Sequence, residues 1–196
     1  MVKRDISLHN EITRKILHII AGMAFVAVAL VVERSFGKTV LLWLIFIALL
    51  VSLVTDYLRV ECGWKLRGFA FLERAREVGR LHATTYTFIG ALLAFIFFDR
   101  DIAYAGILMF FLGDAAAAIF GRVWGRRKFI GKKSVLGTSV MLVISLVVGV
   151  AILRDVWLAI IMALSATIVE ALVEKMDDSF LIILFSGIVA QFLRFI

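Results

Sequence analysis

The sequence predicts an all-α fold, a polytopic membrane bundle of about seven transmembrane helices with one amphipathic helix at the membrane interface. Of the 196 residues, 63% are hydrophobic, and the mean hydropathy of +1.03 is well above that of a soluble domain. The apolar residues form long runs, and about 20 such residues span a bilayer. The chain has no proline and no linker-like tract, so residues 1–196 are predicted to form one membrane domain.

Seven apolar runs are candidate transmembrane helices. In chain order they are 16–33, 38–58, 83–99, 102–121, 135–153, 156–173 and 180–195. The first run lacks the small-residue cleavage site of a secretory signal, so we expect it to remain as a span. The single cysteine, Cys62, excludes an internal disulfide and is expected to be inert.

The basic residues predict the orientation, because they stay on the cytoplasmic side in short loops. Seventeen of the 22 Lys and Arg residues fall on the side of the N-terminus and of the loops 59–80 and 122–133. The N-terminus is therefore expected in the cytoplasm and the C-terminus outside. Tryptophans agree, because Trp64 and Trp124 fall at inner boundaries and Trp43 and Trp157 at outer ones.

The loop 61–82 has apolar residues at roughly helical spacing between charged ones. It predicts an amphipathic helix in the inner interface. Such a helix either anchors the connection to the membrane or roofs an active site.

Charged residues inside a span are costly and mark function by default. The first span opens with Glu11, Arg14, Lys15 and His18, which share one helix face. Asp114 lies in the inner half of the fourth span. The remaining polar residues at the same predicted face are Asp56, Arg59, His82, Glu170, Glu174, Asp177 and Asp178.

Each of these features also has a structural explanation. Asp114 could be inter-helix hydrogen-bond glue, and His18 and His82 could be interfacial histidines. Glu170 and Glu174 could pair with Lys175 or Arg14. The basic loop could hold anionic lipid headgroups.

Together, acids opposite a glycine-rich basic loop fit a polyanion that is bound with a divalent cation. Mg²⁺ prefers carboxylates and substrate phosphates as ligands, while Lys, Arg and backbone N–H groups near glycines bind phosphate oxygens. The loop is not of the Walker type, because five residues separate Gly125 from Gly131, Lys132 is followed by Lys133, and no strand is predicted before it.

Four blocks of the chain resemble the CTP-dependent lipid kinases, a family that includes dolichol, phytol, farnesol and diacylglycerol kinases. The most distinctive is G-D-x-x-A-x-x-x-G-R-x-x-G from Gly113 to Gly125. The others are E-x-x-R-K-x-x-H at Glu11–His18, K-S-x-x-G-T at Lys133–Thr138, and the acidic block that ends at Asp178. The chain departs from the family at Val135-Leu136, where many members have a polar or acidic residue.

The resemblance implies γ-phosphate transfer from CTP to a membrane lipid alcohol, with Mg²⁺ as the cofactor and dolichol or another polyprenol as the expected acceptor. Diacylglycerol is the alternative acceptor. Phosphoryl transfer mainly requires positioning and charge stabilisation. On this basis we expect Asp114, Asp177 and Asp178 to bind the metal and Asp114, Glu170, His82 and His18 to have catalytic roles, with Glu170 or His82 as the group that takes the hydroxyl proton. The residues expected to contact CTP and its phosphates are Arg14, Lys15, Gly113, Gly121, Arg122, Gly125, Arg126, Arg127, Lys128, Lys132, Lys133, Ser134, Gly137 and Thr138.

Two other classes of protein fit less well. A CTP:lipid-phosphate cytidylyltransferase would resemble its family through a His-Gly-Gly segment, which this chain lacks, and the only Asp-Arg-Asp, at 99–101, falls on the predicted outer face. A small membrane transporter would require a polar pathway to both faces, whereas the third, fifth and seventh spans are almost featureless. The expected partners are thus CTP, a lipid alcohol and the bilayer, with no nucleic acid.

Overall fold

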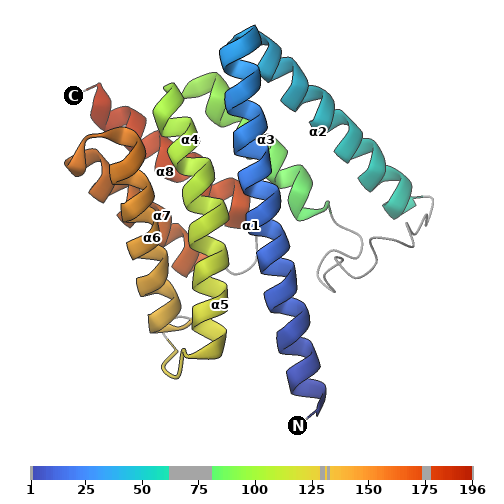
Figure 1. The fold of residues 1–196 in the computed structure, drawn as a ribbon, viewed down its shortest axis with the longest axis vertical. Coiled ribbons are helices and arrows are strands. Elements are labelled where there is room, and N and C mark those ends of the chain that lie inside the picture. The colour runs from blue at the N-terminus through green and yellow to red at the C-terminus, as the bar shows by residue number, and fades with distance from the viewer. Residues whose placement is uncertain (1, 62–80, 129–130, 132, 174–177, 196) are drawn as a thin grey trace.

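The chain folds into an all-helical bundle in which successive helices run up and down (Figure 1). The structure is a computed structural model that describes residues 2–61, 81–128, 131, 133–173 and 178–195. The helices are α1 (Val2–Phe36), α2 (Lys38–Glu61), α3 (Ala83–Phe97), α4 (Arg100–Leu108), the π-helix η1 (Met109–Asp114), α5 (Ala115–Val123), α6 (Val135–Leu153), α7 (Val156–Leu172) and α8 (Asp178–Arg194). The predicted amphipathic helix at 61–82 falls almost entirely outside the described residues.

Each predicted apolar run corresponds to helix over nearly all of its length. Among the described residues, four helical stretches are long and apolar enough to cross a membrane: Ile12–Phe36, Lys38–Glu61, Arg100–Val123 and Val135–Leu153. The shorter apolar helices are Ala83–Phe97, Val156–Leu172 and Phe180–Arg194. A membrane-embedded helical bundle is therefore supported, and the number of seven crossings stays a prediction.

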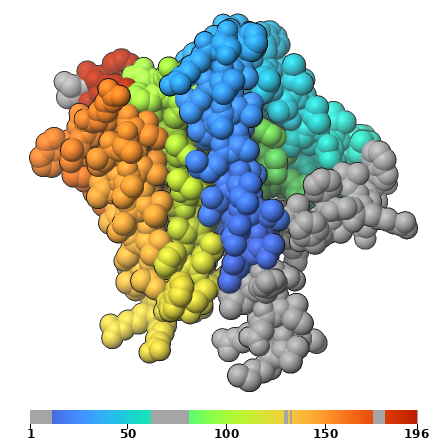
Figure 2. All heavy atoms as spheres, viewed as in Figure 1, coloured from blue at the N-terminus to red at the C-terminus, as the bar shows by residue number. Residues whose placement is uncertain are grey.

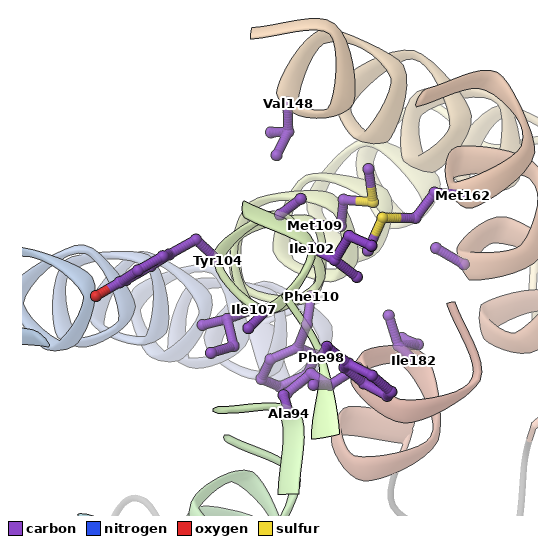
Figure 3. Close-up of a cluster of buried hydrophobic side chains, with 14 of the residues drawn as sticks. Ala94, Phe98, Ile102, Tyr104, Ile107, Met109, Phe110, Val148, Met162 and Ile182 are labelled. Carbon is purple, nitrogen blue, oxygen red and sulfur yellow. The ribbon is translucent and has the colours of Figure 1, made fainter. Parts of the chain in front are cut away.

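The rod formed by α4, η1 and α5 lies at the centre of the bundle. In its most apolar 18-residue window 72% of the residues are buried, against 17% for α1 and α2. Figure 3 shows side chains of the rod, such as Ile107 and Met109, among side chains of the surrounding helices, including Ala94, Met162 and Ile182. A residue on this rod is therefore held on several sides.

The helix α2 presents an exposed apolar stripe. Trp43, Ile47, Val51 and Val54 follow one another at about one helical turn, and each is more than half exposed. Such a stripe is unfavourable in water and suits lipid tails, because burial of apolar surface is the main driving force of folding.

The two ends of the bundle differ. The N-terminus and the connection between α5 and α6 lie at one end, which we call the site end, and the C-terminus lies at the other, the far end (Figure 1). This arrangement matches the predicted separation of the N-terminus and the 122–133 loop from the C-terminus.

Candidate active site

A buried ion pair joins α1 to the central rod. The Lys15 ammonium donates a hydrogen bond to Oδ2 of Asp114, and the two side chains are only 8% and 6% exposed. Charges removed from solvent are tolerated when they are paired. The pair brings together two of the residues that the sequence placed on different helices of the site.

A second buried ion pair joins the basic loop to α7. The Lys133 ammonium donates to Oε1 of Glu170, whose side chain is 4% exposed. The other oxygen of Glu170, Oε2, is buried and has no hydrogen-bond partner within the described part of the chain. The structure thus gives Glu170 a different partner from Lys175 or Arg14, which the sequence had suggested.

The two pairs belong to one group of charges. Asp114 also interacts electrostatically with Lys133 and His18. The His18 ring packs against Phe110 and Phe111, with ring centroids 5.1 and 4.8 Å apart. We call Lys15, His18, Asp114, Lys133 and Glu170 the charge cluster. It draws on α1, η1, α7 and the residues before α6, so that segments far apart in sequence meet.

Asp114 is the last residue of η1, a π-helical turn in an otherwise α-helical rod. Short π-helical turns widen the helix by i→i+5 hydrogen bonding and frequently occur at functional sites. The same turn carries Phe110 and Phe111, so one local distortion positions both the carboxylate and the rings that hold His18. The sequence does not predict this turn, because apolar periodicity has no signal for it.

The two ends of the basic loop pair with each other as the arms of a hairpin do, and we call the described residues 124–128, 131 and 133–134 the α5–α6 hairpin. The Val135 amide donates to the Arg127 carbonyl at 3.1 Å, and Lys128 and Ser134 form an antiparallel β-bridge. Ser134 is buried and caps α6, since its hydroxyl accepts a hydrogen bond from the Gly137 amide at 3.1 Å. This cap fixes the position of Lys133, the preceding residue.

Glycines let the hairpin and its two helices pack closely. A Cβ on Gly125 would lie 2.2 Å from the Gly121 carbonyl oxygen, and a Cβ on Gly137 would lie 2.9 Å from the Ala117 carbonyl oxygen. A Cβ on Gly113 would lie 2.5 Å from the Met141 sulfur. These glycines therefore have packing roles, and their contacts with phosphate stay predictions.

The cations of the loop divide into two sets. Lys133 turns inward to Glu170, whereas Arg122, Arg126, Arg127 and Lys128 are exposed. Thr138, in the first turns of α6, has a buried hydroxyl with no hydrogen-bond partner among the residues that can be described. Arg14 is partly buried beside Lys15 on α1.

His82 lies at a second polar group, between α2 and α3. Asp56 is 1% exposed and accepts hydrogen bonds from the His82 amide at 2.9 Å, the Thr85 hydroxyl at 2.7 Å and Arg59 at 3.3 Å. Asp56 thus caps the start of α3 and ties it to the end of α2. The partners of this carboxylate favour a structural role.

The Asp-Arg-Asp segment lies at the far end of the bundle. Arg194 donates to Asp99 at 3.1 Å and to Asp101 at 2.6 Å. Arg100 and Tyr104 both contact Glu33 of α1, at 2.9 and 2.8 Å. Because Arg100 begins the rod and Asp114 ends η1, the segment is remote from the charge cluster, as the sequence predicted.

Several predicted site residues lie where the structure gives no side-chain description. Lys132 and Asp177 fall outside the described residues, as does Glu174, and nothing is described of the side chains of Glu11 and Asp178. Among the residues that are described, no three His, Cys, Asp or Glu side chains group to hold a metal ion. The assignment of a metal to Asp114, Asp177 and Asp178 stays a prediction.

One comparison with known proteins is informative. The chain is similar to the CTP-dependent diacylglycerol kinase 1 of Saccharomyces cerevisiae, with 25% identity over 142 residues, which cover 68% of this chain. It spans about half the length of that relative, 47%. No family model and no solved structure matches the chain. The similarity supports the CTP-dependent lipid kinases as a family and does not identify one member.

Proposed function

We propose that the chain is a CTP-dependent lipid kinase that transfers the γ-phosphate of CTP to the hydroxyl of a membrane lipid. The observation that carries the proposal is the charge cluster, in which two lysines and two carboxylates meet at one end of an apolar bundle. Such a site can bind a triphosphate at the boundary where a lipid hydroxyl is also found. The similarity to a CTP-dependent kinase supports the choice of the nucleotide.

The residues of the cluster have distinct roles in this proposal. Lys15 and Lys133 neutralise their carboxylates in the structure, and both ammonium groups can turn to phosphate oxygens when the nucleotide enters. Arg14 and Arg122 add positive charge nearby. Glu170 lies buried next to Lys133 and accepts the proton of the lipid hydroxyl, a role that requires hydrogen-bond reach to the acceptor.

The proposed donor set of aspartates fits a divalent cation. Asp114 provides carboxylate oxygens, whereas the buried Oε2 of Glu170, which has no hydrogen-bond partner among the described residues, stays available for the proton of the lipid hydroxyl. Hard cations such as Mg²⁺ bind one or two carboxylates together with substrate phosphates. When bound, the ion neutralises the charge on the phosphate oxygens. We propose Asp114 as a ligand, with Asp177 and Asp178 as further ligands.

The acceptor we propose is a polyprenol of the dolichol type, with diacylglycerol as the second candidate because the similar yeast protein is a diacylglycerol kinase. An apolar groove discriminates lipid chains weakly, by about 1–3 kcal/mol per methylene. The active site is proposed to face the cytoplasm, as the distribution of basic residues predicts.

The test is transfer of label by the purified full chain in lipid, with CTP labelled at the γ- or the α-position. We expect γ-label in dolichol or another polyprenol and release of CDP. Label in diacylglycerol alone would select the second acceptor. Label from the α-position, with release of pyrophosphate, would establish a cytidylyltransferase instead. If no lipid gains more label with the parent chain than with the Asp114→Asn control, the proposed enzymatic activity would be rejected.

A further inference from the structure

The α5–α6 hairpin has an outward row of cations that the charge cluster does not use. Arg126, Arg127 and Lys128 are exposed. Ser134, across the β-bridge from Lys128, is buried, and the adjacent Lys133 turns inward to Glu170. The described part of the hairpin, 124–128 with 131 and 133–134, contains no acid. The row therefore attracts anions that approach from outside the bundle.

Two exposed aromatic rings precede this row in the sequence. Phe120 is 43% exposed and Trp124 is 59% exposed, and the two rings contact each other at a tilt of 37°, with centroids 5.2 Å apart. Phe120 lies near the end of the apolar stretch Arg100–Val123, and Trp124 follows it directly. Aromatic rings at this position typically lie at headgroup level in a membrane. In Figure 2 the yellow segment that carries this region projects from the site end.

We propose that the outward row binds the phosphate groups of anionic lipids in the leaflet around the site end, with Trp124 and Phe120 inserted among the headgroups. Clusters of Lys and Arg immediately beside a transmembrane helix bind anionic lipid surfaces. The aromatic pair favours anionic lipids over a soluble nucleotide as the ligand of the row, because rings inserted among the headgroups would hold the row at the headgroup layer. The surface adds to the proposed kinase and does not depend on it, since it uses other residues than the charge cluster.

The binding has a structural consequence for the site. The outward row at residues 126–128 is joined to the residues that follow Lys133 by the Arg127–Val135 hydrogen bond and the Lys128–Ser134 bridge. Headgroups that hold the outward row therefore also hold the residue that contacts Glu170.

The test is quenching of Trp124 fluorescence by brominated lipids. The full chain, with the other three tryptophans replaced by Phe, is reconstituted in membranes of phosphatidylcholine and phosphatidylglycerol, with bromine on one lipid at a time. We expect phosphatidylglycerol to be enriched over phosphatidylcholine near Trp124 by about fivefold or more, the factor for one cation at an anionic surface. High salt should reduce the enrichment.

Matched variants distinguish the surface from general electrostatics. Arg126→Gln/Arg127→Gln should lose most of the enrichment, whereas Arg34→Gln/Lys38→Gln, with two exposed cations at the far end, should keep it. Equal quenching by both lipids in the parent chain would overturn the proposal. The proposal would also be overturned if Arg126→Gln/Arg127→Gln kept the enrichment of phosphatidylglycerol but lost affinity for CTP in pure phosphatidylcholine. That result would show that the row binds the nucleotide.

A second measurement applies if the tryptophan replacements unfold the protein. Native mass spectrometry on chains with all four tryptophans then counts the phosphatidylglycerol molecules that stay bound through purification. Equal retention by the two double variants would overturn the proposal. The quenching needs no CTP, so a failure of the proposed kinase activity leaves this result unchanged.

Discussion

Lys15 on α1 and Asp114 at the end of η1 form a hydrogen-bonded ion pair across 99 residues of sequence. Both side chains are almost completely buried. A buried charge without its partner is strongly unfavourable. Each residue therefore constrains the other, and substitutions must be designed so that loss of folding is not taken for loss of chemistry.

Asp114→Asn should abolish phosphate transfer even at saturating CTP, because it removes the proposed metal ligand. It also leaves the Lys15 ammonium without a counter-charge, which costs about 3–5 kcal/mol. The Lys15→Met/Asp114→Asn double variant removes both charges and should recover much of that stability in thermal unfolding. If the double variant also recovers activity, the pair is structural and Asp114 has no chemical role.

The second ion pair should separate nucleotide binding from proton transfer. Lys133→Gln should raise KM for CTP and lower kcat, because the ammonium contacts phosphate in the proposed complex. Glu170→Gln should lower kcat by roughly 10²–10⁴-fold, the range for a general base, with little change in KM for CTP. Steady-state kinetics with both substrates measures the split.

Glu33→Gln is the matched control for Glu170, because Glu33 is also a largely buried acid paired with a cation, but at the far end. Its substitution should lower stability without changing kcat. A near-normal kcat in folded Glu170→Gln would contradict the assignment of Glu170 as the base.

Gly125→Ala should destabilise the protein by about 1–3 kcal/mol, the usual cost of overpacking. The added methyl group would lie 2.2 Å from a backbone oxygen of Gly121, and that oxygen cannot rotate away. Gly90→Ala is the comparison, since its Cβ would have no neighbour closer than 3.4 Å. Alanine in mid-helix there should be neutral or stabilising. Thermal unfolding in detergent measures both, and equal effects would show that the hairpin does not pack as described.

Cysteines at the two ends of the bundle should react from opposite sides of the membrane. Lys128→Cys and Ser35→Cys, each in a Cys62→Ser background, place exposed thiols at the site end and the far end. A thiol reagent that cannot cross membranes should label Ser35→Cys in intact cells. It should label Lys128→Cys only after the cells are permeabilised. Labelling of Lys128→Cys in intact cells would mean that the site faces away from cytosolic CTP.

The helices were predictable from sequence because charged residues bound the apolar runs. The run 135–153 corresponds to α6 (Val135–Leu153), and the run 156–173 to α7 (Val156–Leu172). The first helix extends well beyond its apolar run, from Val2, because its polar opening also has helical spacing. Apolar content marks the part of a helix in the membrane, not the end of the helix.

The residues of the charge cluster were also predictable, since buried charge in a span is rare and costly. Their pairing was not. Lys133 is positioned for Glu170 by the Ser134 cap of α6 and by the close packing of Gly125 against Ser134, and neither contact can be read from the apolar pattern. Asp56 shows the opposite case, because sequence alone cannot distinguish a carboxylate that caps a neighbouring helix from one that binds a substrate.

The π-helical turn makes the central rod sensitive to chain length rather than to composition. An α-helix turns by about 100° per residue, and η1 accommodates extra chain within one turn. Deleting a single residue between Met109 and Leu112 would let the rod close into uninterrupted α-helix, and the parts on either side would stay nearly in phase. If η1 instead became α-helical with every residue kept, the part before it would stay in place among α3 and α8, while Asp114 and everything after it would rotate about the rod axis. The carboxylate would then point away from Lys15 without any change in the polarity of the sequence, so the phase of this one helix determines whether the bundle has a site at all.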